Sequence, residues 1–216
     1  MRDIFLYVDK EKLDEIYKEK NISKESRAKI NFIVNFEWDQ FDKVKGLNGR
    51  ASCQDSPIEF MIMRLAQYLS YDRELISLIF DNMTYAKDEK FNPIYDKYAR
   101  MMEYTDKKNF EKIKKGLNYL SPVKRSTLLS IKNALQNQKV KFPDKLEKVR
   151  PEKSESKRIS STDYFICEIS FMSLKTLWKI EELVKMKNHN LVEKIYQNTI
   201  YLYKRLNYGV GNERQK

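Results

Sequence analysis

The residues best suited to chemistry in this chain lie in a polar loop just before a strongly marked helix start. Arg50, Cys53 and Gln54 precede Ser56-Pro57, a serine placed to cap a helix and a proline placed to open it. The first turn of a helix carries unpaired N–H groups that favour anions. We therefore predict that Arg50 and Gln54 bind an anionic ligand and that Cys53, as a stabilised thiolate, is catalytic. The alternative is a self-satisfied helix start with Cys53 packed as a small apolar residue.

Two polar residues interrupt the apolar helix that follows this loop. Arg64 and Gln67 fall within the apolar run 61–68, so they must reach water, a ligand or a buried partner. We predict that both bind the same anion, with Arg64 holding it and Gln67 orienting it. The alternative is one buried ion pair together with an amide hydrogen bond.

A third group of polar residues occurs later, within the run 96–103. Asp96, Arg100 and Glu103 share one helical face at i, i+4 and i+7. We predict that Arg100 binds the ligand and that Glu103 is a catalytic general base, provided that the fold buries it. Surface ion pairing is the alternative. Asp163 and Glu168, at the start of a later helix, could meet Arg64 or Arg100, or could simply suit the helix dipole.

Several kinds of chemistry lack their usual residues. The chain has one histidine, His189, which is too few for a typical zinc or histidine-rich di-iron site. It has no phosphate-binding P-loop, no dinucleotide glycine pattern and no Gly-x-Ser-x-Gly. A carboxylate-only site for Mg²⁺ is conceivable from Glu59, Asp96, Glu103 and Glu168, but we predict no metal site and the cofactor is unknown.

Composition and pattern predict an all-α fold. Gly and Pro number five each, and Lys, Glu, Leu, Ile and Met recur at helical spacing. We predict a single helical domain over 1–216, a bundle or array of about 7–9 helices, with N-terminal helices in 1–45, the polar motifs in 46–138, a basic mobile segment at 139–160 and a C-terminal helical pair in 161–209. Gly116 is expected to end a helix in the left-handed conformation. The expected helices cover about 10–20, 24–45, 57–71, 72–91, 94–104, 109–115, 122–137, 161–187 and 190–207.

Charge and hydropathy restrict the partners and the compartment. No run of about 18 apolar residues exists, so no membrane-spanning segment is expected. The N-terminus is too short and too acidic for a signal peptide, and two cysteines are too few for a disulfide framework, so a cytoplasmic protein is expected. The net charge is +11 and the pI about 9.4, which allows nucleic acid as a partner. Nucleic acid is not favoured, because the lysines are spread along the chain and no recognition motif accompanies them.

Four stretches together resemble a bacterial family, the one catalogued as domain of unknown function 4125. They are Asn48-Gly49-Arg50-Ala51-Ser52-Cys53-Gln54-Asp55, then Phe60-Met61-Ile62-Met63-Arg64 with Gln67, then Asp96-Lys97-Tyr98-Ala99-Arg100-Met101-Met102-Glu103, and finally Asn198-Thr199 with Tyr208-Gly209. The family pattern has Glu where this chain has Asp96, and an aromatic residue where it has Val210. The family has no assigned activity. Its members are similar to domains found beside or fused to nucleotidyltransferase-like domains, which implies an accessory role with such a partner.

The sequence therefore favours one function and leaves two alternatives to it. The first is an anionic small-molecule site formed by Arg50, Gln54, Arg64, Gln67 and Arg100, with Cys53 and Glu103 as catalytic candidates. The second is a basic module for nucleic acid or an acidic protein, using the lysine-rich surface and the segment 139–160. The third is a structural accessory domain whose polar motifs are internal ion pairs and which has no site.

Overall fold

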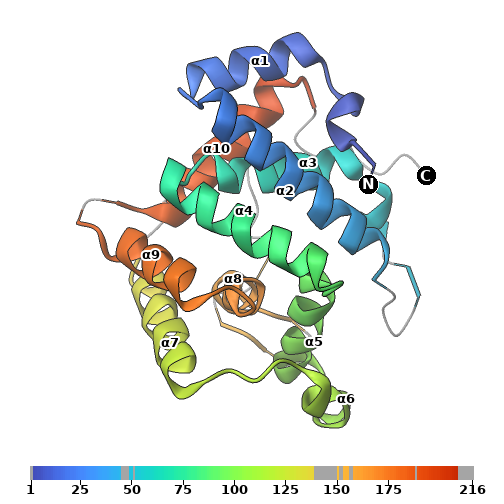
Figure 1. Cartoon of the computed structure of the whole chain (residues 1–216), viewed down its shortest axis with the longest axis vertical. Coiled ribbons are helices and arrows are strands. Elements are labelled where there is room, and N and C mark those ends of the chain that lie inside the picture. The colour runs from blue at the N-terminus through green and yellow to red at the C-terminus, as the bar shows by residue number, and fades with distance from the viewer. Residues whose placement is uncertain are drawn as a thin grey trace. The chain divides into compact units, whose positions relative to one another are not determined.

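The protein is built from helices throughout the part of the chain that the structure describes. The computed structural model describes residues 2–44, 49–50, 52–138, 150, 153–155, 158–187 and 189–208. Over these ranges it shows ten α-helices, three short 3-10 helices and no β-sheet, which confirms the all-α prediction (Figure 1). The elements are η1 (Ile4–Tyr7), α1 (Lys10–Glu19), α2 (Lys24–Asp42), η2 (Ser52–Asp55), α3 (Pro57–Tyr68), α4 (Arg73–Asp88), α5 (Pro93–Thr105), α6 (Lys107–Ile113), η3 (Lys114–Gly116), α7 (Pro122–Gln136), α8 (Ser161–Ile169), α9 (Leu174–Lys185) and α10 (Leu191–Arg205).

Most helices begin at the cap residues that the sequence indicates. The side chains of Asp9, Ser23 and Ser121 each accept a hydrogen bond from a backbone N–H of the turn that follows. Asn92 and Ser160 do the same for α5 and α8. Because these side chains satisfy donors that a helix start leaves unpaired, they fix where each helix begins.

Two helix ends differ from the sequence prediction. Gly116 does not adopt a positive φ, so the expected left-handed cap is wrong, and a 3-10 turn closed by Leu117 N–H and Lys114 C=O ends the segment instead. The single helix expected over 161–187 forms α8 and α9. Ser170 bonds back to a carbonyl of α8 and Ser173 caps α9, because serine side chains compete with the backbone ladder.

Contacts divide the chain into two compact units. Unit 1 comprises Met1–Thr84 and Glu193–Lys216, and unit 2 comprises Tyr85–Val192. The single domain over 1–216 stays a prediction. The basic mobile segment predicted at 139–160 falls mostly outside the described residues, which include only 150, 153–155 and 158–160 of it.

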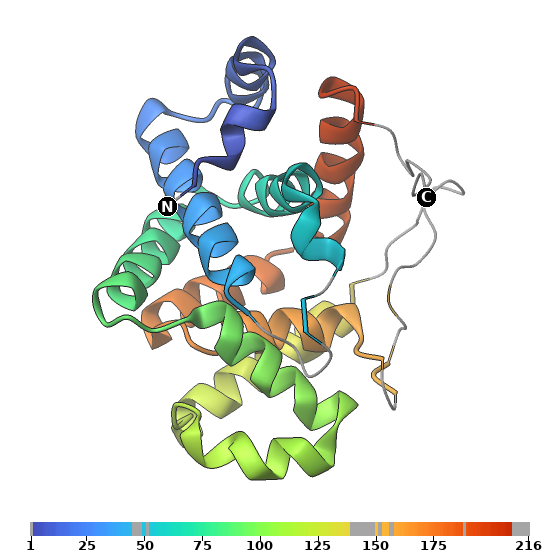
Figure 2. The ribbon, with the colours of Figure 1, turned by 90° about the vertical axis from the view of Figure 1, so that its right-hand side faces the viewer.

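Unit 1 is organised around α3, which lies between α2 and α10 in Figure 2. The rings of Trp38, Phe41 and Phe60 pack against one another where α2 meets α3, with centroids 5.2–5.9 Å apart. Asn35 accepts a hydrogen bond from the Ile4 amide and so fixes η1 on α2. This packing holds the polar residues of α2 and α3 face to face.

One buried asparagine ties α10 to the rest of unit 1. Asn198, from the fourth resembling stretch, donates to the Ser70 hydroxyl at 2.9 Å and accepts from Lys20 Nζ at 2.7 Å. Its side chain is nearly inaccessible to solvent. Because a buried amide must be hydrogen-bonded, this position specifies how α10 docks.

In unit 2, α8 packs against α5 and α7, and α7 packs along α9 (Figure 1). Leu128, Ile131 and Leu177 are buried in its core. Gln138, just beyond α7, donates to the Val184 carbonyl at 3.0 Å and so joins the ends of α7 and α9. The polar face of α5 is thereby held against α8.

Substitution of Asn198→Ala should lower the free energy of unfolding by about 1–3 kcal/mol, because it leaves the buried Ser70 hydroxyl and the Lys20 amine without this partner. Urea unfolding followed by circular dichroism measures this change. Gln197→Ala, an exposed change on the same helix, is the matched control. Equal effects of the two substitutions would contradict this account of α10 docking.

Candidate functional site

The predicted loop residues Arg50 and Gln54 attach a turn to the end of α2. Arg50 binds Asp42 at 2.7 Å, Asp55 at 2.9 Å and the Gln54 carbonyl at 2.6 Å. The buried Gln54 amide donates to the carbonyls of Phe41, at 2.7 Å, and Val44, at 2.9 Å. Hydrogen bonds from Arg50 to the carboxylates of Asp55 and Asp42 raise the pKa of its guanidinium. Much of the binding capacity of both side chains is therefore used within unit 1.

The Ser56 side chain and Cys53 do not fit the alternative of a self-satisfied helix start with a packed cysteine. Ser56 and Pro57 stand at the expected positions of α3, but the Ser56 side chain makes no capping hydrogen bond. Cys53 is exposed, so the expectation that it packs in the interior is wrong, and Cys167 is the buried cysteine of the chain. Cys53 is accessible to reagents, and its catalytic role stays a prediction.

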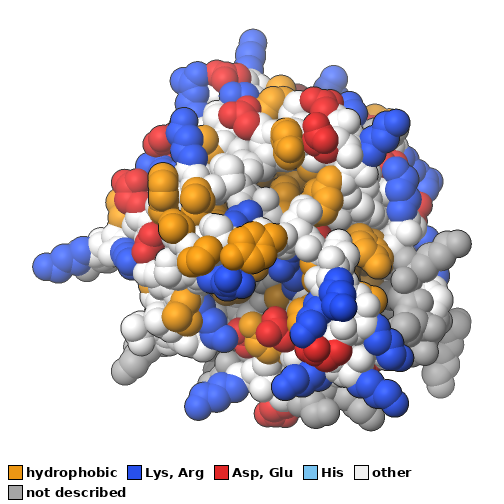
Figure 3. Space-filling view, turned by 60° about the horizontal axis from the view of Figure 1, so that its bottom comes forward, with side chains coloured by type: hydrophobic (Ala, Val, Ile, Leu, Met, Phe, Trp, Pro, Cys, Tyr) orange, Lys and Arg blue, Asp and Glu red, His pale blue; other side chains and the backbone are white. Residues whose placement is uncertain are grey.

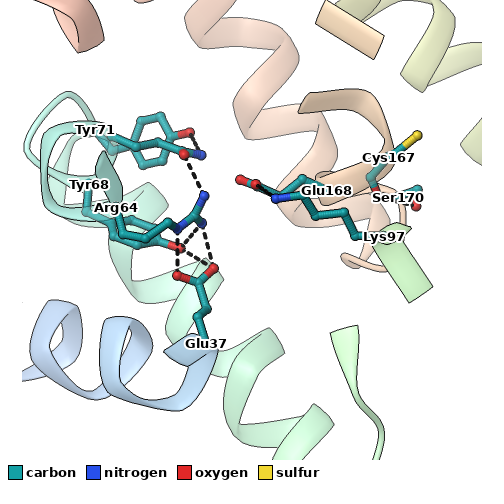
Figure 4. Close-up of polar contacts among 9 residues, drawn as sticks. Glu37, Arg64, Tyr68, Tyr71, Lys97, Cys167, Glu168 and Ser170 are labelled. Atoms are coloured by element: carbon teal, nitrogen blue, oxygen red, sulfur yellow. Dashed lines mark hydrogen bonds and ion pairs between the residues drawn. The ribbon is translucent and has the colours of Figure 1, made fainter. Parts of the chain in front are cut away.

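Arg64 is held by a buried carboxylate that sequence reasoning did not single out. Glu37 of α2 has no exposed surface and receives Arg64 Nε at 2.8 Å and Nη2 at 2.6 Å, a two-pronged ion pair (Figure 4). The Tyr68 hydroxyl donates to the same carboxylate at 2.8 Å and accepts from Arg64 at 2.7 Å. The pair joins α2 to α3.

Gln67 extends this network along α3. Its carbonyl accepts from Arg64 Nη1 at 2.8 Å, and its amide donates to the Tyr71 hydroxyl at 2.9 Å. The buried ion pair and the amide hydrogen bond of the alternative interpretation are therefore both present. Within unit 1, the charge of Arg64 is compensated by the protein itself.

Arg100 of α5 is bound on one side and open on the other. Its Nε donates to Asp96 at 2.7 Å, and its Nη2 donates to the Asn118 carbonyl at 2.8 Å. Its side chain is 12% exposed. The Nη1 group makes no hydrogen bond to the described residues, which leaves two donors available to a ligand.

Lys124, in the first turn of α7, is close enough to this arginine for the two charges to interact. It is half-buried, and no carboxylate of the described residues forms an ion pair with it. Burial lowers the pKa of its amine, the charge of Arg100 lowers it further, and Asp96 acts in the opposite direction. Asp96 is thus the carboxylate that serves two neighbouring cations.

A second buried pair crosses from α5 to α8. Lys97 donates to Glu168 at 2.7 Å, and both are 4% exposed. Lys97 Nζ also lies 3.7 Å from the centre of the Tyr164 ring, a cation–π contact. Burial raises the pKa of the nearby Cys167 to about 12, and Asp163 adds to this shift, so that thiol is neutral at physiological pH and unsuited to nucleophilic chemistry.

Asp163 collects donors from α7 and from the residues before α8. Lys132 Nζ lies 2.6 Å from it, and the hydroxyls of Ser154 and Ser160 donate to it at 2.6 and 2.9 Å. Burial raises the pKa of this carboxyl, but the hydrogen bonds from these three residues outweigh it and hold the pKa below its ordinary value of 3.8. Asp163 is accordingly a structural anion that fixes the start of α8.

Glu103 does not have the burial that its predicted role requires. It lies on α5 one turn beyond Arg100, and its side chain is exposed. Arg100 and Glu103 thus share a helix, as do Arg64 and Gln67, while Arg50 and Gln54 share the loop. Over the described ranges, no group of three or more His, Cys, Asp or Glu residues is arranged to hold a metal ion.

Lys124 was not predicted as a site residue, although the composition of the first turn of α7 contains a signal for it. The first turn of α7 contains Lys124 and Arg125 and no acidic residue. Cations at a helix start oppose the helix dipole, so such a turn suggests an anion nearby.

A comparison with protein families identifies the chain. A family model described as protein of unknown function (DUF4125) matches residues 27–207. The chain belongs to this family. No curated protein and no solved structure matches this DUF4125 member. Every helix in the described part of this DUF4125 chain is too short or too polar to cross a membrane.

Replacing Glu37 with alanine should lower the free energy of unfolding by about 3–5 kcal/mol, because the buried Arg64 guanidinium loses its carboxylate. Urea unfolding at neutral pH measures the effect. Glu25→Ala removes an exposed carboxylate that pairs with Lys29 and Arg73 and should change stability little. A small loss for the Glu37 variant would show that this ion pair does not hold α2 and α3 together.

Asp163→Asn should cost about 2 kcal/mol at neutral pH, and this cost should shrink in acid. Because the folded-state pKa of Asp163 is below its unfolded value, its contribution is present above pH 3.8 and is lost as the pH falls through the folded-state pKa. Unfolding of both proteins in urea between pH 7 and pH 2 measures the difference. A difference that stays constant over this range would refute the ionic role of Asp163.

Proposed function

We propose that this protein binds a small anionic molecule at the start of α7, through Arg100 and Lys124. One observation carries the proposal: a half-buried lysine lies beside a half-satisfied arginine, and the two share Asp96. Like charges that are partly removed from water repel each other more strongly than exposed ones. An anion placed between them would compensate this charge and engage the open Nη1 donors of Arg100.

The local charge of the chain supports an anionic ligand. The segment 112–125 contains five basic residues and no acidic one. Lys114 of this segment pairs with Glu111, and Lys124 has no such partner among the described residues. A phosphate or carboxylate group, which accepts several charge-assisted hydrogen bonds, matches these donors.

The surface distribution favours a small ligand over a long polyanion. Figure 3 shows lysine and arginine side chains interspersed with carboxylates on the face that it draws. A protein that tracks a nucleic-acid backbone usually presents a continuous basic stripe. The second expected function, a basic binding module, receives no support from this face.

The proposal is one of binding. The catalytic roles of Cys53 and Glu103 stay predictions, as does an accessory role beside a nucleotidyltransferase-like protein. In unit 1, the Glu37–Arg64 pair favours the interpretation that the polar motif on α3 is an internal ion pair. Ligand binding and structural ion pairing are therefore assigned to different parts of the chain.

Lys124→Gln should weaken the binding of inorganic pyrophosphate by about ten- to a hundred-fold, since one charge-assisted contact is lost. Isothermal titration calorimetry at low ionic strength measures this change, and rising salt should weaken the wild-type binding. Lys124→Gln should fold normally, because it removes a cation that Arg100 repels.

Lys108→Gln is the matched control, because it removes the same charge from an exposed position on α6. It should leave the affinity nearly unchanged. Absence of pyrophosphate binding at millimolar concentration, or equal losses in the two variants, would contradict the proposed site.

A further inference from the structure

An exposed tyrosine stands next to the proposed anion site. Tyr119 directly follows Asn118, whose carbonyl accepts a hydrogen bond from Arg100 at 2.8 Å. Its side chain is 75% exposed, among the largest apolar surfaces that unit 2 leaves in water. The chain then reaches Ser121, which caps the backbone N–H of Lys124. Tyr119 and both proposed anion-binding residues are thus connected through one short segment.

The tyrosine ring is held in place although it is exposed. Arg125 of α7 places its guanidinium 5.3 Å from the ring centre and donates to the hydroxyl at 3.4 Å. Guanidinium groups and phenol rings both offer flat surfaces on which a planar group can stack. With three-quarters of its surface in water, the ring retains room for such a partner.

We infer that the anion bound at Arg100 and Lys124 belongs to a nucleotide, whose base stacks on Tyr119. This inference rests on the proposed function and specifies its ligand class. The phosphates would bind Arg100 and Lys124, and the base would lie against the tyrosine ring and the guanidinium of Arg125. Stacking tolerates any base, because every base has a π-face.

Tyr119 directly follows the residue whose carbonyl Arg100 binds. A nucleotide carries both phosphates and a planar base, so one molecule would offer a group to the cations and a group to the ring. A bare carboxylic acid or inorganic phosphate would leave the ring unused.

The test compares ADP with inorganic pyrophosphate by isothermal titration calorimetry on the full chain. Wild-type protein should bind ADP more tightly than pyrophosphate. Tyr119→Ala should weaken ADP binding by roughly fivefold to a hundredfold and leave pyrophosphate binding unchanged, because only ADP carries a base. Tyr119→Phe keeps the ring and should retain most of the ADP affinity.

Tyr95→Ala is the matched control, since it removes a tyrosine that is 53% exposed on α5. It should leave both affinities unchanged. Because Tyr119 is exposed, its variants should keep the wild-type circular dichroism spectrum.

The outcomes separate this inference from the proposed function. Pyrophosphate binding that depends on Lys124, with ADP bound no more tightly and no effect of Tyr119→Ala, overturns the nucleotide inference and leaves the anion site intact. Failure of both ligands to bind overturns both. Affinity for single-stranded oligonucleotides that grows steadily with their length would instead identify a nucleic-acid surface and would also overturn the inference.

Discussion

The structure depends on the rule that an ionised side chain removed from water must be compensated. In unit 1, the Glu37 carboxylate takes the Arg64 guanidinium in two hydrogen bonds and joins α2 to α3. In unit 2, the pair Lys97–Glu168 joins α5 to α8, and Lys132–Asp163 joins α7 to α8. Each pair crosses between two different helices. Because removing either partner would leave a buried charge unpaired, the pairs fix which helices pack together.

The same rule of charge compensation applies to Lys124. Its amine is half-buried, its charge is opposed by Arg100, and Asp96, the carboxylate of the described residues that acts on it, already holds that arginine. A protein that only needed solubility would place such a cation in water. In the proposed function, an external anion would complete the cluster and compensate this charge. With Tyr119 beside it, the cluster also has an aromatic surface for a planar group attached to that anion.

Much of the helical fold could be predicted from the sequence, and the pairing of charges could not. Cap residues such as Ser121 specify helix starts locally, so α7 begins where it was expected. The break between α8 and α9 was missed because Ser170 and Ser173 lie within an apolar run that reads as one helix. Trp178 belongs to the apolar pattern of this run, yet it is 53% exposed, because periodicity alone does not show which face a neighbouring helix covers. For the candidate site, Arg100 was found from its i, i+4 spacing to Asp96, whereas the contribution of Lys124 depends on tertiary packing.

The charge state of Lys124 tests the central claim most directly. Nuclear magnetic resonance can follow the titration of its side chain in the free protein and with saturating pyrophosphate. In the free protein, its pKa should lie below the ordinary lysine value of 10.5, and the bound anion should raise it. An unshifted pKa that pyrophosphate does not change would show that Lys124 needs no anion, and it would contradict the account.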